Sequence, residues 1–218
     1  MMDLANKRIV VTAGGTREPI DPVRYIGNRS SGKMGFALAD AAKDRGADIT
    51  LVTTIAPLEP GYHDKVHQVE TLAEMREAVL NACKSADVLI MAAAISDFRV
   101  ANPADHKIKK GEGKLVLELV ENEDFLLELT DNFIKVGFAA ETNDLLENAE
   151  KKLLQKRLDF ICANDVTAAD SGFGVDTNRV TLISRDGKIE ELPLMSKREV
   201  ADKILDRVVG LLTKEVGK

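Results

Sequence analysis

Tryptophan is absent from this sequence of 218 residues, and tyrosine and cysteine occur only twice each. Cys83 and Cys162 lie far apart, so they fit neither a disulfide framework nor a zinc site, and we expect both in the core. The longest apolar stretches, such as residues 88–95, stop far short of the roughly 20 residues that a membrane span needs. Residues 1–7 carry charges where a signal peptide needs an apolar run. These absences exclude a membrane-embedded protein and predict a cytoplasmic one.

The overall charge argues against a nucleic-acid partner. The formal net charge is −6, whereas neutralising phosphates requires a clustered basic surface. With 44% hydrophobic and 30% charged residues, the chain is suited to one sizeable globular domain. The sequence contains no repeat, low-complexity segment or linker, so we predict a single domain over residues 1–218.

Apolar strands alternate with amphipathic helices along most of the chain. We expect strands at 7–13, 48–53, 66–69, 87–93, 135–138 and 159–162, and helices at 32–45, 72–84, 125–130 and 145–157. This alternation predicts an α/β fold with a Rossmann-like, doubly wound, mostly parallel sheet. The tail differs, because Asp186-Gly187 between residues 180–184 and 188–192 predicts a C-terminal β-hairpin, followed by a helix over 197–212.

Unusual residues follow three of the expected strands, and ligands of such sheets bind outside the carboxyl ends of the strands. After the first strand, Gly14 and Gly15 let backbone amides approach an anion, and Ser30, Ser31 and Lys33 precede the next helix like a phosphate site. A serine cap beside a solvated lysine explains the same pattern equally well.

The other two strand ends are also compatible with a ligand. Small residues at Met91, Ala92 and Ala93 leave room for a flat ring, and Asp97 follows them; alternatively, the alanines allow close helix packing and Asp97 caps a turn. Phe138 lies at the third strand end. Lys152 and Lys156 share one helix face, where they either meet a ligand or complement the helix dipole.

Familiar nucleotide motifs match poorly. Gly27 to Lys33 has most of the spacing of a P-loop, but Met34 stands where a magnesium-binding hydroxyl belongs. A dinucleotide fingerprint needs closely spaced glycines, whereas a long insertion separates Gly15 from Gly32, so NAD binding is weakened but not excluded. His63 and His67 have the spacing of a helical metal pair without the helix or further ligands, and we assign no metal ligand.

Longer motifs carry a resemblance to a known family. Residues 12–35, TAGGTREPIDPVRYIGNRSSGKMG, closely resemble the opening of bacterial phosphopantothenoylcysteine synthetases, and residues 92–99, 107–110, 136–143 and 159–165 extend the resemblance over nearly the whole chain. The resemblance implies that CTP activates 4'-phosphopantothenate as an acyl-cytidylate with Mg²⁺ present, and that L-cysteine then forms the amide. In many bacteria this unit follows a phosphopantothenoylcysteine decarboxylase domain in one bifunctional chain.

The resemblance also implies roles for single residues. Asn28 matches the active-site asparagine, Arg24 is a candidate for positioning an anion, and Lys107 heads a flexible lid of residues 107–114 that contacts the nucleotide. Contacts to CTP are implied for Met91, Ala92, Ala93, Asp97, Glu123, Asp124, Phe125, Leu126, Phe138, Lys152 and Lys156. The chain departs from the family at Asn122-Glu123-Asp124, where relatives often have Asn-Pro-Asp, which leaves the backbone course there open.

Three further points follow from the resemblance. The family is usually homodimeric, and the hairpin over 180–192 either pairs two copies or only extends its own sheet. The preference for CTP over ATP rests on the resemblance alone. Two rival functions are a short-chain reductase, whose Tyr-x-x-x-Lys pair is missing because Arg29 and Val66 follow Tyr25 and Tyr62, and a non-catalytic nucleotide sensor.

Overall fold

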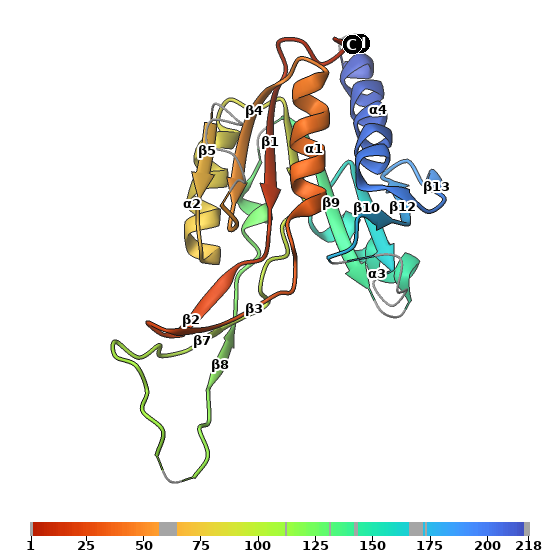
Figure 1. The fold of residues 1–218 in the computed structure, drawn as a ribbon. Helices are drawn as coiled ribbons and strands as arrows, with labels where there is room; N and C mark the ends of the chain where they lie inside the picture. The colour runs from red at the N-terminus through yellow and green to blue at the C-terminus, as the bar shows by residue number, and fades with distance from the viewer. Residues whose placement is uncertain are drawn as a thin grey trace.

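The fold is an α/β sandwich around one large sheet (Figure 1). The computed structural model describes residues 2–56, 65–111, 113–130, 132–141, 144–165, 172 and 174–215. Its eight-stranded sheet has the order β13-β12-β10-β9-β6-β1-β4-β5. The strands are β1 (Arg8–Ala13), β4 (Asp48–Thr53), β5 (Lys65–Gln68), β6 (Val88–Met91), β9 (Ile134–Glu141), β10 (Phe160–Asp165), β12 (Val180–Ser184) and β13 (Ile189–Glu191).

The sheet confirms the predicted Rossmann-like class. The run β5-β4-β1-β6-β9-β10 is parallel throughout, and its order is that of a dinucleotide-binding fold, with the reversal between β1 and β6. The predicted C-terminal hairpin is present, and β12 pairs antiparallel with β10. The hairpin therefore extends its own sheet; whether it also pairs two copies stays a prediction.

Helices cover both faces of the sheet. α1 (Lys33–Asp44) and α4 (Lys197–Glu215) pack on one face, while α2 (Leu72–Cys83), the 3₁₀ turn η1 (Phe125–Glu128) and α3 (Leu145–Gln155) pack on the other. Strand β1 is buried on both faces: Ile9 and Val11 join the core beneath α1 and α4, and Val10 joins the core beneath α2. A continuous apolar run is what such a central strand requires.

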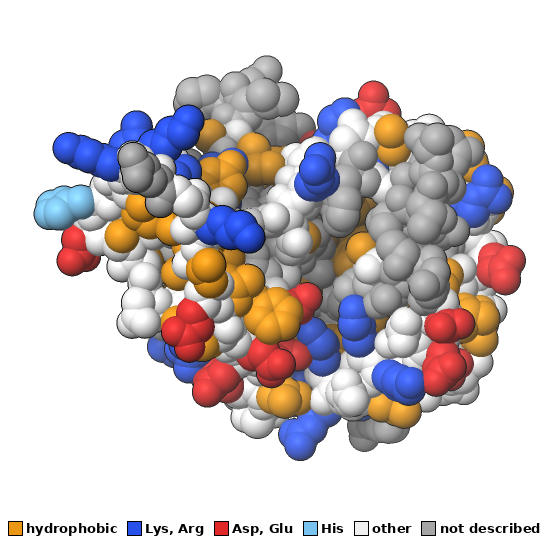
Figure 2. All heavy atoms as spheres, turned by 90° about the horizontal axis from the view of Figure 1, so that it is seen from below, with side chains coloured by type: hydrophobic (Ala, Val, Ile, Leu, Met, Phe, Trp, Pro, Cys, Tyr) orange, Lys and Arg blue, Asp and Glu red, His pale blue; other side chains and the backbone are white. Residues whose placement is uncertain are grey.

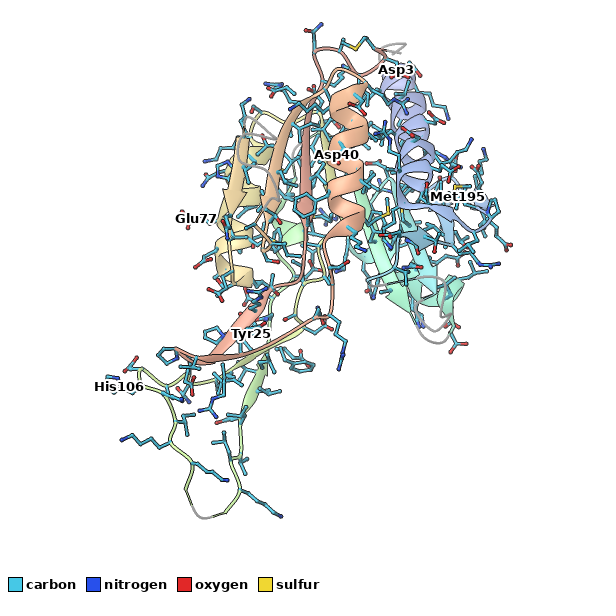
Figure 3. All side chains as sticks on the ribbon, viewed as in Figure 1. Asp3, Tyr25, Asp40, Glu77, His106 and Met195 are labelled. Carbon is cyan, nitrogen blue, oxygen red and sulfur yellow. The ribbon has the colours of Figure 1, made fainter. Side chains whose placement is uncertain are left out.

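Four short strands form a projecting arm at the carboxyl end of the sheet, where the sequence had suggested only loops. They are β2 (Arg17–Asp21), β3 (Arg24–Gly27), β7 (Phe98–Val100) and β8 (Leu119–Glu121). We call residues 17–27 and 98–121 the arm; Figure 3 shows Tyr25 and His106 on it, away from the body. These strands escape sequence reasoning because they are short and have no alternating apolar face, and the residues that β2 buries are the polar Glu18 and Asp21.

Two smaller differences concern the other elements. The helix expected over 125–130 is only one 3₁₀ turn, which Asp124 caps by accepting from the Leu126 amide. A two-residue pair, β11 (Thr177–Asn178) with β14 (Met195–Ser196), joins the residues just before α4 to those just before β12. Within the described part of the chain, no helix is both long enough and apolar enough to cross a membrane.

Candidate functional site

A cavity of about 420 Å³ lies at the carboxyl end of the sheet, over the ends of β6, β9 and β10 and beside the start of α1. Gly15 pairs with Ala94 just beyond β1 and β6, and Ala94 lines the cavity. Figure 2 views this end of the molecule and shows Lys and Arg side chains around its central hollow. The position is the one at which doubly wound sheets bind their ligands.

The start of α1 forms one wall of the cavity. Ser30, Ser31 and Lys33 line it, and Gly32 precedes the helix in the left-handed conformation (φ 74°). The Ser30 hydroxyl accepts from the Gly32 amide at 3.4 Å, and no side chain caps the helix itself. The first amides of α1 and the positive end of its dipole are therefore available to an anion.

Asn28 lies at the same wall, and its side chain is held in place. Its Nδ2 donates to the Ile95 carbonyl at 3.0 Å, which leaves the second N–H and Oδ1 for other partners. Gly15 makes this placement possible, because a Cβ there would lie 3.0 Å from the Asn28 carbonyl oxygen. Gly14 has φ 89°, and a Cβ on it would lie 2.2 Å from the Thr54 hydroxyl. Both glycines thus shape the site without lining it.

The residues after β6 make the floor. Met91, Ala92, Ala93 and Asp97 all line the cavity, and their contacts with CTP stay predictions. The backbone here is fixed by two buried hydroxyls of the neighbouring β1 segment: the Thr12 hydroxyl accepts from the Ala93 amide at 3.0 Å, and the Thr16 hydroxyl accepts from the Ser96 amide at 2.9 Å. The small side chains therefore present a rigid, flat surface.

The opposite wall combines η1 with α3. The expected residues Glu123, Asp124, Phe125, Leu126, Phe138, Lys152 and Lys156 all border the cavity. Lys156 pairs with Asp124 at 3.0 Å, which joins the end of α3 to the cap of η1. Phe125 and Leu126 are at most 6% exposed, so their side chains serve mainly to pack this wall.

Several lining residues had escaped sequence reasoning. They are Asn122, Asn164, Gly172, Asn178 and Lys197. The Asn122 side chain donates to the Ser96 carbonyl at 2.8 Å. This hydrogen bond links the base of the arm, where β8 ends, to the floor of the cavity. Asn178 and Lys197 come from the tail, which carries no motif that could have indicated a site. Only the fold brings these distant segments together.

Residues 4–212 match the family model of the DNA/pantothenate metabolism flavoprotein C-terminal domain. The chain belongs to this family. It is 46% identical over 219 residues to the coenzyme A biosynthesis bifunctional protein CoaBC of Bacillus subtilis, covering 99% of this chain and 54% of that protein. The chain therefore spans about half the length of such curated relatives.

Solved structures of similar proteins extend the comparison to the whole fold. The crystal structure of the C-terminal domain of a CoaBC protein matches with TM-score 0.82 and 40% identity, covering 98% of this chain and 100% of that one. A Cab2 mutant in complex with phosphopantothenate-cysteine shares the fold, with TM-score 0.78 and 20% identity over 97% of this chain and 88% of that one.

Two residues to which the family resemblance assigns catalysis, Arg24 and Lys107, do not line the cavity of their own chain. Both belong to the arm. Arg24 donates to the Asp21 carboxylate at 2.5 Å and to the Ile108 carbonyl at 2.7 Å. Within one chain, Arg24 therefore fastens the segment carrying Lys107 onto the β2–β3 hairpin, and the roles of both residues stay predictions.

No group of three or more His, Cys, Asp or Glu residues able to hold a metal occurs among the residues that the structure describes. His63 and residues 142–143 of the family motif lie outside those residues. Cys83 and Cys162 are buried, as expected, and burial raises the pKa of the Cys162 thiol far above its ordinary value. Neither cysteine is therefore suited to nucleophilic chemistry.

Replacing Asp21 with Asn is expected to loosen the arm and to leave the core intact. The buried Asp21 carboxylate accepts from the Arg24 guanidinium and from the Ile108 and Val23 amides. The Arg24 guanidinium, foremost among these donors, holds the pKa of Asp21 well below its usual range. Hydrogen exchange of residues 101–111 should accelerate about tenfold, corresponding to loss of one charge-assisted network, while the melting temperature changes little.

The pH dependence provides a second readout of the same contact. Because the folded-state pKa of Asp21 is lowered, its stabilisation is complete above about pH 4, the pKa of an unfolded aspartate, and is lost as the pH falls below that. Wild-type exchange in the arm should therefore approach that of Asp21→Asn in acid. Asp48→Asn, which removes an exposed partner of Lys65, is the control and should leave arm exchange unchanged. Equal exchange in both variants would contradict the assignment.

Proposed function

We propose that the chain is a phosphopantothenate–cysteine ligase of coenzyme A synthesis that uses CTP. The observation that carries the proposal is the cavity at the carboxyl end of the sheet, which gathers Asn28, the start of α1, the floor after β6 and the η1–α3 wall. The full-length similarity to the CoaBC C-terminal domain supports the same activity. Because the chain spans about half of such relatives, a decarboxylase domain or protein is proposed as its partner.

The first step joins the two substrates through phosphorus. A carboxylate oxygen of 4'-phosphopantothenate attacks the α-phosphorus of CTP, the bond to the bridging oxygen breaks, and pyrophosphate leaves with the electron pair. The flat floor at Ala92 and Ala93 suits the base or ribose, and the open amides of α1 with Lys33 suit the phosphates. Lys152 and Lys156 add positive charge on the opposite wall.

The second step forms the amide. The amine of L-cysteine attacks the acyl carbonyl, the bond from carbon to the phosphate oxygen breaks, CMP leaves with the electron pair, and the nitrogen releases one proton to water. Asn28 has an N–H beyond the one held by Ile95, and this donor is suited to the oxygen on which negative charge accumulates. Because its other N–H is already bound, the donor needs no reorganisation during the reaction.

Magnesium is compatible with the cavity as an ion held mainly by the triphosphate. Mg²⁺ typically keeps only one or two carboxylate ligands besides phosphate oxygens and water. Asp97 and Glu123 place carboxylates at the cavity, and either would complete such a shell. The ion would neutralise charge on the phosphates.

We further propose that two copies associate through the arm. Val23, Tyr25, Phe98, Leu115 and Val116 are exposed on it, between 48% and 83%, although apolar side chains of this size usually seek cover. Arg24 and Lys107 lie on the same arm, outside the cavity of their own chain. Pairing through the arm would cover the apolar side chains and bring these cations to a second copy. Strand β13, at the edge of the hairpin, is a weaker candidate for the contact between two copies, because it has only three residues and two of them are glutamates.

Pyrophosphate release by the purified chain tests the function. With Mg²⁺, 4'-phosphopantothenate and CTP, we expect release that requires phosphopantothenate and falls at least about tenfold when ATP replaces CTP. Adding L-cysteine should yield CMP and the amide product in equal amounts. A folded, nucleotide-binding sample that turns over neither nucleotide would favour the sensor instead.

A further inference from the structure

Lys197, the first residue of α4, carries an ammonium that is buried beside the cavity. The residue is 7% exposed, and its Nζ donates to three backbone carbonyls, those of Gly172, Val175 and Thr177, at 2.5 to 3.1 Å. An ammonium has three donors, so all of them are used. Lys197 therefore acts on a ligand through the segment that it holds and through its charge, without a hydrogen bond of its own.

Lys33 also binds this segment. The Lys33 ammonium donates to the Gly174 carbonyl at 2.9 Å and to the Asp176 carboxylate at 2.7 Å. We call Gly172 together with residues 174–177 the clamp segment. Because Lys33 extends from the first turn of α1 and borders the cavity, the clamp segment fixes where its charge lies.

The two lysines differ in how firmly they are engaged. The ion pair of Lys33 is open to water, since its side chain is 45% exposed and that of Asp176 is 88% exposed. Such pairs are weak and exchange readily. Lys197 also donates its backbone amide to the Asp176 carbonyl at 2.9 Å, and β14 pairs with β11 beside it. Lys197 is thus the fixed partner of the clamp segment, and Lys33 is the exchangeable one.

We propose that Lys197 is a positioning residue for the polyphosphate end of the nucleotide. By fixing the clamp segment, it presents Lys33 at the start of α1, and a bound polyphosphate then takes the Lys33 ammonium over from the Asp176 carboxylate. This inference rests on the proposed function, because it takes the polyphosphate to be that of CTP. Asp176 in this arrangement is a competitor that holds Lys33 in place while the cavity is empty.

The electrostatics of the site agree with this exchange. The neighbouring Lys33 ammonium lowers the pKa of the Asp176 carboxyl, and burial together with Lys33 lowers the pKa of Lys197. The Lys33 charge acts on Lys197, so the two ammonium groups repel each other, and an anion carrying several charges would relieve that repulsion. A ligand with only one phosphate carries less negative charge to the two ammonium groups. The contribution of Lys33 and Lys197 to affinity should therefore depend on the number of phosphates.

The experiment measures calorimetric affinities of the full chain for CTP, CMP and inorganic tripolyphosphate. Lys197→Met and Lys33→Met should each weaken CTP and tripolyphosphate about tenfold, the scale of one lost charged contact, and leave CMP unchanged. Asp176→Asn should tighten both polyphosphates about threefold. In the double variant, the loss should be well below the product of the single losses, because both lysines act through one segment.

The outcomes separate a positioning role from a merely structural one. Equal weakening of CTP and CMP in Lys197→Met, unchanged CTP affinity, or strictly multiplicative losses would overturn the proposal. Should Lys197→Met not fold, Asp176→Asn decides, and unchanged or weaker polyphosphate binding rejects the exchange. Tripolyphosphate binding that responds to these variants in a chain without ligase turnover would reject the proposed function alone. A wild-type chain that binds neither polyphosphate rejects both.

Discussion

Asn28→Ala is expected to lower the rate of amide formation by about 10² to 10³-fold, the usual loss when one preorganised oxyanion donor is removed. The affinity for CTP should stay within about threefold of wild type, because the interaction is made in the transition state of the second step. Single-turnover release of pyrophosphate in the absence of L-cysteine should persist. Quench-flow measurement of pyrophosphate and amide on the same samples checks both statements.

Asn81→Ala is the matched control for this substitution. Asn81 lies on α2, and its side chain accepts from the Lys84 ammonium at 2.8 Å on the exposed surface. Its removal should change neither step. If Asn28→Ala abolished pyrophosphate release as well, the side chain would act in carboxylate activation, and the assignment to the amide-forming step would be wrong.

Gly35→Ala is expected to destabilise the protein by about 1 to 3 kcal/mol, the cost of overpacking a rigid contact. A Cβ on Gly35 would lie 2.6 Å from the Ala13 Cβ and 2.7 Å from the Thr12 carbonyl oxygen. These atoms belong to the central strand β1 and cannot move aside, so α1 must shift. Thermal unfolding should show a melting temperature about 2 to 10 °C lower, and CTP binding should weaken because α1 forms a cavity wall.

Gly210→Ala gives the opposite expectation for the same chemical change. Gly210 lies inside α4, and a Cβ there would meet nothing within 4 Å. Alanine should therefore stabilise the protein by about 0.5 to 1 kcal/mol through helix propensity. If Gly210→Ala lost as much stability as Gly35→Ala, the loss in Gly35→Ala could not be assigned to the close approach to Ala13.

The sequence predicts the central sheet because its strands are long, apolar and separated by helices with a clear period. Strand β1 illustrates this: an unbroken apolar run followed by two glycines permits few other readings. The arm could not be predicted, since β2 and β7 are stabilised by contacts between segments distant in sequence, such as the Ala104 amide with the Ile20 carbonyl at 2.9 Å. Local patterns contain no information about such pairings.

Some residues of the candidate site could likewise be predicted from the sequence, and others could not. Asn28 and Asp97 belong to motifs, Lys156 was indicated by its spacing from Lys152, and the fold gathers all of them at one cavity. Gly14 and Gly15 do not line the cavity but permit close packing around Asn28 and Thr54, and their contact with a ligand stays a prediction. Lys197 could not be predicted as a site residue, because its ammonium binds three carbonyls that lie 20 to 25 residues earlier in the chain. A buried lysine is recognisable only once its surroundings are known.

The way in which the arm leaves the sheet has a consequence for how such chains can diverge. One half of the arm starts and ends beside the Gly15–Ala94 bridge, and the other half is closed at its base by the Asn122 amide donating to the Asp97 carbonyl at 2.8 Å. Each half is therefore a loop with pinned ends, and doubling the length of such a loop costs only about 0.6 kcal/mol. Insertions and deletions can accumulate there while the sheet keeps its register, so the outer reach of the molecule can evolve separately from its folding core.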